Sequence, residues 1–66
     1  MLKINYVMEE RGVTQTQLAR LIGKQQPTIS LYVNGKQNPR AKARRLIARA
    51  LRWPEERADE LFEEDR

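Results

Sequence analysis

The twenty residues from Gln15 to Asn34, QTQLARLIGKQQPTISLYVN, constrain this chain more than any other stretch. Apolar residues recur at helical spacing on both sides of Gly23, while the residues directly after it are polar. A glycine at this position allows the left-handed backbone that ends one helix and redirects the chain into the next. The stretch therefore predicts two short helices, over 15–22 and 26–34, joined by a tight bend.

Thr14 and Gln17 predict where the first of these helices begins. They fit a capping box, in which the Thr14 hydroxyl accepts a bond from an amide of the first turn and the Gln17 side chain accepts one in return. Within the helix, Leu18, Ala19 and Ile22 share one face, and Ala19 is small enough for a second helix to cross closely. This face is expected to be buried.

The second helix has one apolar side and one nearly uncharged polar side. Ile29, Tyr32 and Val33 fall together and are expected in the core, and Pro27 fits only the first helical turn. The opposite side carries Pro27, Thr28, Ser30, Leu31 and Asn34. Such a pair of helices suits a helix-turn-helix, whose second helix enters the major groove of DNA.

Three further helices are predicted around this pair, which gives five over about 2–11, 15–22, 26–34, 40–51 and 54–62. The helix over 2–11 buries Ile4, Val7 and Met8 and ends at Gly12. In the fourth, Asn38 is expected as the N-cap and Pro39 as the first helical residue. Its expected apolar stripe is Ala43, Leu46, Ile47, Ala50 and Leu51.

The fifth helix is expected to open with Pro54 in its first turn, and acids there suit the positive end of the helix dipole. Its predicted buried face is Ala58, Leu61 and Phe62. The last residues, 63–66, are expected to fray.

Charge is segregated along the chain. From Arg11 to Pro54 there are ten Lys or Arg residues and no Asp or Glu, whereas residues 55–66 carry seven acids and two arginines. This asymmetry implies a polyanionic partner for the middle of the chain and an acidic end turned away from it. A solvated charged surface is the alternative, although an ordinary surface mixes the two signs.

Composition excludes several classes of protein. The chain has 66 residues, enough for one domain with a thin core, and it has neither Cys nor His. Without them we expect no disulfide, no metal site, no catalytic residues and no enzymatic activity. No apolar run approaches the roughly 18 residues that span a bilayer, and the N-terminus lacks the apolar core of a signal peptide. We expect a cytoplasmic protein with no membrane contact, no cofactor and no small-molecule ligand.

The motifs RGVTQTQLARLIG and TISLYVNGK resemble the lambda-repressor-like family of small helix-turn-helix regulators, which includes the phage Cro and CI types. The resemblance covers about residues 4–62 and implies an all-α, five-helix DNA-binding domain with the helix-turn-helix at its second and third helices. It makes residues 1–66 a single Cro-sized domain. The implied function is a sequence-specific transcriptional regulator, most simply a repressor on a palindromic operator. The alternative is a protein-interaction module, such as an antitoxin-like or coactivator-like domain.

The resemblance also implies which residues contact double-stranded DNA. Base edges are assigned to Gln25, Gln26, Pro27, Thr28, Ser30 and Leu31. Phosphates are assigned to Gln15, Asn34, Lys36, Asn38, Arg40 and Arg44. Gln26 suits a bidentate pair with adenine and Leu31 a thymine methyl, but these polar residues also fit a merely solvated helix start.

Dimerisation is implied through the C-terminal region, where Leu51, Trp53 and Pro54 are candidates for the interface of a weak homodimer. Trp53 could instead cap the core between the fourth and fifth helices. Arginines of the fourth helix could contact phosphate, pair with the acidic fifth helix, or remain solvated.

Three positions depart from the family pattern. Pro27 replaces a hydrogen-bonding side chain and Lys24 an apolar turn residue. Met8 and Val33 stand where some relatives place an ion pair, and we expect an apolar contact there.

Overall fold

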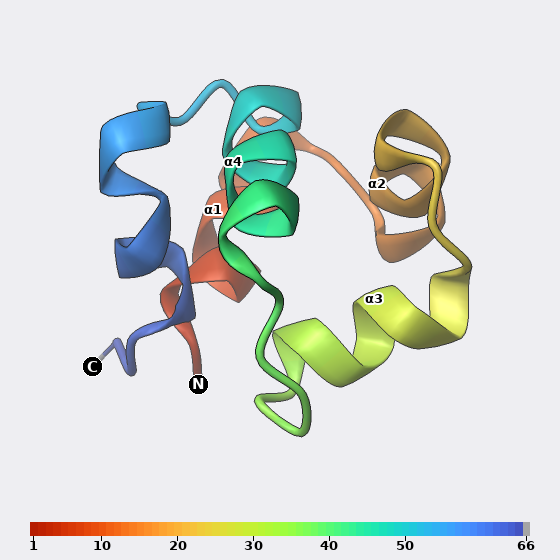
Figure 1. Ribbon diagram of the computed structural model, residues 1–66, viewed down its shortest axis with the longest axis horizontal. Coiled ribbons are helices and arrows are strands. Elements are labelled where there is room, and N and C mark those ends of the chain that lie inside the picture. Colours follow the sequence, from red (N-terminus) through yellow and green to blue (C-terminus); the bar gives the residue numbers. More distant parts are fainter. Residues whose placement is uncertain (66) are drawn as a thin grey trace.

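Residues 1–65 are described by the computed structural model, in which helices alone form the named elements; Arg66 lies outside the described residues. The elements in chain order are α1 (Lys3–Arg11), α2 (Gln15–Ile22), α3 (Gln26–Val33), α4 (Ala41–Ala50) and the 3₁₀-helix η1 (Glu55–Phe62). In Figure 1, α2 and α3 lie on one side of the molecule and η1 on the other, with α4 between them. The expected all-α fold with five helices is confirmed.

The predicted boundaries of α2 are confirmed in detail. The Thr14 Oγ1 accepts a bond from the Gln17 amide at 3.1 Å, and the Gln17 Oε1 accepts one from the Thr14 amide at 2.8 Å. At the other end Gly23 has a φ of 71°, in the left-handed region. Pro27 lies in the first turn of α3, as expected. Local sequence therefore defines both helices of the motif.

A single apolar core joins all five helices. The largest side chains with no exposure are Ile4, Leu18, Ile29, Ile47, Leu51 and Leu61. Met8 and Val33 are also buried in this cluster, which agrees with the apolar environment expected for them. In α4, the expected stripe residues Ala43, Ile47 and Leu51 are buried, whereas Leu46 and Ala50 are only half-buried and Ala48 is buried instead. The spacing of Ile47, Ala48 and Leu51 by three and four residues explains the difference.

The predicted N-cap of α4, Asn38, is wrong by two residues. Its N-cap is Arg40, and the helix begins at Ala41. Pro39 is fully buried. Packing of its ring against the core therefore keeps Pro39 outside the helix, directly before the N-cap Arg40. The Pro39 carbonyl accepts a bond from Arg44 Nη1 at 2.8 Å. Packing of Pro39 thus overrides the local helix-start signal.

The C-terminal region differs from expectation in two ways. The fifth helix is a 3₁₀-helix with non-helical backbone angles at Arg57, and it buries Ala58 and Leu61, which are three residues apart, as a threefold helix requires. Beyond it, the chain does not fray through Asp65. The Lys3 amide donates to the Glu63 carbonyl and the Asp65 amide to the Met1 carbonyl, each at 2.9 Å. The two ends of the chain accordingly lie close together (Figure 1).

Candidate nucleic-acid interface

The first residues of α2 and α3 are joined by a side-chain hydrogen bond. Gln26 Nε2 donates to Gln15 Oε1 at 2.8 Å, so the amino ends of the two helices are adjacent. Each helix end has backbone amides without helical partners and a partial positive charge. Together they form a place where a phosphate group is electrostatically favoured.

The outer face of α3 is accessible where base contacts were predicted. Gln25, Gln26 and Pro27 are exposed, and Leu31 is 40% exposed. Thr28 and Ser30 are half-buried. This face combines an amide, a hydroxyl and an exposed apolar side chain, the groups that distinguish base edges in a major groove.

The inner face of α3 holds the helix in place. Ile29, Tyr32 and Val33 are buried, as predicted. Asn5 of α1 adds a bond from its Nδ2 to the Val33 carbonyl at 2.8 Å, near the end of α3. Sequence reasoning missed Asn5, because its partner lies 28 residues away and no local motif marks the contact. The helix is thereby fixed to the core along one side.

The end of α3 and the loop after it hold most of the residues predicted to contact phosphate. Asn34 donates to the Ser30 carbonyl at 2.8 Å and lies within 3.3 Å of the Ser30 hydroxyl, so its side chain is ordered at the helix end. Lys36, Asn38 and Arg40 are exposed, and within residues 1–65 their side chains make no hydrogen bond or ion pair.

Arg44 is held inside the domain. Its Nε lies 2.8 Å from Asp59 Oδ1, its Nη1 donates to the Pro39 carbonyl, and its side chain is 29% exposed. Arg49 similarly pairs with Glu55 at 3.1 Å. Arg44 and Arg49 are therefore paired with the acidic segment, one of the alternatives considered from sequence, and the phosphate contact expected of Arg44 stays a prediction.

The chain matches the family described as helix-turn-helix over residues 4–56. It belongs to the lambda-repressor-like helix-turn-helix family. This is a family of DNA-binding regulators. Searches among curated proteins and among solved structures return no match.

The candidate dimer residues of this helix-turn-helix domain have different environments. Leu51 has no exposed surface and belongs to the core, so its assignment to an interface is corrected: packing within the domain already covers it. Trp53 is half-buried against the core, and its Nε1 donates to the Arg57 carbonyl at 2.9 Å. Pro54 is exposed.

Two guanidinium groups lie over the Trp53 ring. The Arg57 Cζ is 5.2 Å and the Arg11 Cζ 6.0 Å from its centroid, within the range of cation–π contacts. Arg57 also bonds Glu60 at 2.9 Å; this hydrogen bond, more than any other cause, holds the pKa of Glu60 below its ordinary value and raises the pKa of Arg57. The geometry agrees with a Trp53 that closes the junction between α4 and η1.

The structure also bears on membrane and metal contacts. Within residues 1–65, every helix is too short or too polar to cross a bilayer. The same residues contain no group of three or more acidic, His or Cys side chains arranged to hold a metal ion.

Proposed function

We propose that this domain is a sequence-specific double-stranded DNA-binding regulator of transcription, a Cro-like repressor that acts in the cytoplasm by occupying a palindromic operator. The observation that carries the proposal is the Gln15–Gln26 bond between two adjacent helix starts, with the accessible face of α3 beside it. A helix fixed to a core on one side and accessible on the other can enter a major groove as a rigid unit.

Base reading falls to the amino-terminal and central part of α3. Gln26 has one amide hydrogen committed to Gln15 and retains a second hydrogen and its carbonyl oxygen, the pair of groups that adenine recognition needs. Leu31 contacts a thymine methyl, and Gln25, Pro27, Thr28 and Ser30 complete the contact surface. Pro27 contributes van der Waals contact and a fixed backbone only.

Phosphate contacts place the helix in register. Gln15 and the amides beside it bind the backbone on one side of the groove. Asn34, Lys36, Asn38 and Arg40 bind it on the other side. Such contacts orient the protein on any sequence and supply most of the salt dependence.

A palindromic operator requires two copies of the domain. Two recognition helices would lie about 34 Å apart, one turn of B-DNA. With Leu51 inside the core, Pro54 and the accessible edge of Trp53 remain as the proposed contact between copies. An interface of this size is expected to be weak without DNA.

Selection from a random duplex library, followed by competition, tests the function. The protein should retain a preference of about a thousandfold for the selected duplex over random DNA at near-physiological salt. The double variant Gln26→Ala/Leu31→Ala should lose this preference, whereas Arg45→Ala on exposed α4 surface should keep it. Equal binding to all duplexes would favour the alternative, a protein-interaction module with loose affinity for nucleic acid.

A further inference from the structure

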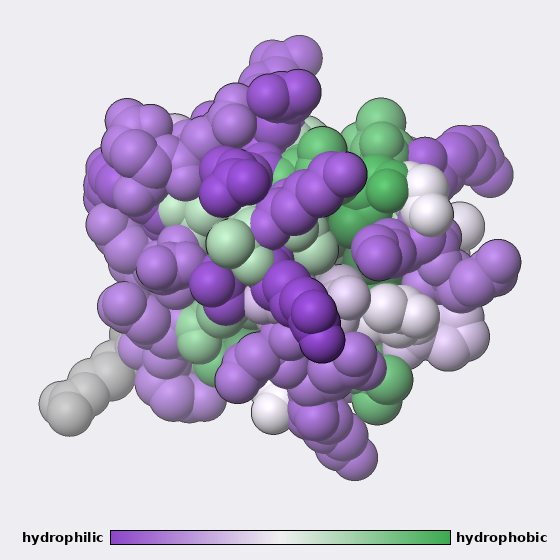
Figure 2. Space-filling model, in the orientation of Figure 1, coloured by the Kyte–Doolittle hydropathy of each residue, from purple (hydrophilic) through white to green (hydrophobic). Residues whose placement is uncertain are grey.

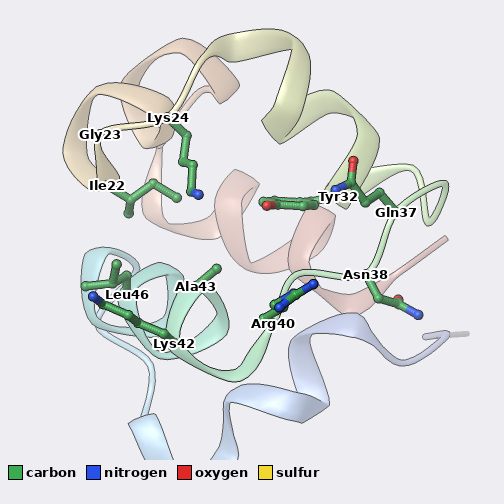
Figure 3. Close-up of a pocket in the computed structure, with 10 residues that line it drawn as sticks. All are labelled: Ile22, Gly23, Lys24, Tyr32, Gln37, Asn38, Arg40, Lys42, Ala43 and Leu46. Atoms are coloured by element: carbon green, nitrogen blue, oxygen red, sulfur yellow. The ribbon is translucent and has the colours of Figure 1, made fainter.

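A pocket of about 480 Å³ lies behind the helix-turn-helix, between the α2–α3 turn, the residues before α4, and α4 itself (Figure 3). This volume lies in the range of small-molecule sites, about 300 to 1,000 Å³. Tyr32 is the α3 residue in its lining, so the pocket lies apart from the polar side of α3 assigned to bases, but it shares Asn38 and Arg40 with the proposed phosphate contacts.

Three cations line the pocket, from the α2–α3 turn and the start of α4. Lys24 comes from the α2–α3 turn, Arg40 from the cap of α4 and Lys42 from its first turn. No acidic residue lines it, and none of the three has an ion pair within residues 1–65, in contrast to Arg44 and Arg49. An uncompensated group of cations around a concave site attracts anions and focuses their approach.

Tyr32 provides an independent observation. Its side chain is buried, with 5% of the residue exposed, yet its hydroxyl has no hydrogen-bond partner among the described residues. Figure 3 shows the hydroxyl end of the ring directed into the space that Lys24 also enters. The hydroxyl oxygen itself is not among the fully buried polar atoms, so it is an accessible donor and acceptor at the pocket.

The remaining lining is partly apolar. Ile22 of α2 and Ala43 and Leu46 of α4 line the pocket beside the charged groups. A bare inorganic ion would leave these side chains without a partner, whereas a ligand with an apolar part would cover them.

We propose that this pocket binds a small organic anion, whose phosphate or carboxylate group contacts Lys24, Lys42 and the Tyr32 hydroxyl and whose apolar part lies on Ala43 and Leu46. This revises the expectation that the domain takes no small-molecule ligand. The proposal rests on the pocket alone and holds whether or not α3 reads DNA.

Nuclear magnetic resonance of the ¹⁵N-labelled full chain tests it with phenyl phosphate as the probe. Phenyl phosphate should give saturable shifts of the Gly23, Lys24 and Asn38 amides. Inorganic phosphate lacks the apolar ring, and phenol lacks the anionic group. At matched ionic strength, each should bind at least about tenfold more weakly than phenyl phosphate.

Three variants locate the binding. Tyr32→Phe removes only the hydroxyl, and Lys42→Gln only one charge; each should weaken phenyl phosphate about tenfold, the size expected when a hydrogen bond to a charged group is lost. Arg45→Gln is the matched control, since Arg45 is also an exposed, unpaired cation of α4 but does not line the pocket. It should bind as the parent does.

Several results would overturn the proposal. One is equal binding of phenyl phosphate and inorganic phosphate; another is equal weakening by Lys42→Gln and Arg45→Gln. The pocket would belong to the DNA interface alone if its amides responded to a random duplex but not to phenyl phosphate. Because the main titration contains no DNA, its failure is distinguishable from a failure of the proposed repressor function.

Discussion

Gln26 Nε2 lies 2.8 Å from Gln15 Oε1, and this bond ties the start of the proposed reading helix to the start of the helix before it. The bond uses the carbonyl oxygen of Gln15 and leaves its amide hydrogens free to donate to a phosphate. It also restricts the rotamers of Gln26 before any base is bound. A phosphate contact and a base contact are therefore expected to be coupled energetically.

A double-mutant cycle on these two residues measures the coupling. Gln26→Ala should reduce discrimination at one base position by about 1–3 kcal/mol. Gln15→Ala should weaken binding to every duplex and also reduce discrimination at that same position, because Gln26 is then free to adopt other rotamers. The measurement is competition binding of the four variants to the selected duplex and to duplexes changed at one base pair. Strictly additive effects would contradict the coupling.

Lys36→Ala should act on affinity without acting on specificity. Its exposed side chain has no partner within residues 1–65, so its proposed contact is to phosphate. Removing one phosphate contact should lower the slope of log affinity against log salt by about 1 and weaken all duplexes alike. Filter binding between low and moderate salt gives the slope, with Gln26→Ala as the comparison that should leave it unchanged. A sequence-dependent effect of Lys36→Ala would assign this side chain to a base edge.

Leu51→Ala should destabilise the folded monomer. Leu51 has no exposed surface, and its carbonyl accepts a bond from Arg11 Nε at 2.9 Å. Truncating a buried leucine costs about 2–5 kcal/mol through lost burial and the cavity that remains. Urea unfolding measures this loss. Sedimentation of the folded fraction should show the same association as the parent, and a selective loss of dimer at unchanged stability would return Leu51 to an interface.

Local signals in the sequence predict the helix-turn-helix accurately. Thr14 with Gln17, Gly23, and Pro27 each act through their own or adjacent backbone, and each was found where expected. The accessible and buried sides of α3 also follow from helical periodicity alone.

The features missed from sequence depend on distant partners. The pair Asn38-Pro39 predicts a helix start, but the Pro39 ring packs in the core and α4 begins at Ala41. The contact from Asn5 to Val33 joins helices far apart in sequence. The anion pocket likewise combines Lys24 with Lys42, which no spacing rule relates.

Acid should weaken the C-terminal region through Glu60. The Arg57 guanidinium holds the pKa of the Glu60 carboxyl below its ordinary value. A carboxyl with a lower pKa in the folded state stabilises the fold above its unfolded pKa, and this contribution is lost as the pH falls through the folded pKa. Glu60→Gln should therefore lose less stability than the parent between about pH 5 and pH 3. Trp53 lies beside Arg57, so its fluorescence should follow unfolding of this region across the pH range. Identical acid sensitivity in both proteins would contradict the role of Glu60.

Substitutions at Gly23 should lower the stability of the fold without changing its affinity for DNA. Its φ of 71° is unfavourable for a residue with a β-carbon, yet apart from Gly23 and its chain neighbours nothing lies within 4 Å of the position where that carbon would be built. Gly23→Ala should therefore cost about 1–2 kcal/mol from backbone conformation alone. Asparagine tolerates left-handed angles better than alanine, so Gly23→Asn should cost less. Thermal unfolding measures both variants, and DNA binding well below their midpoints should equal that of the parent, because the added atom meets free space. A folded Gly23→Ala protein that had lost its affinity for DNA would instead mean that the duplex backbone approaches this turn too closely for a side chain.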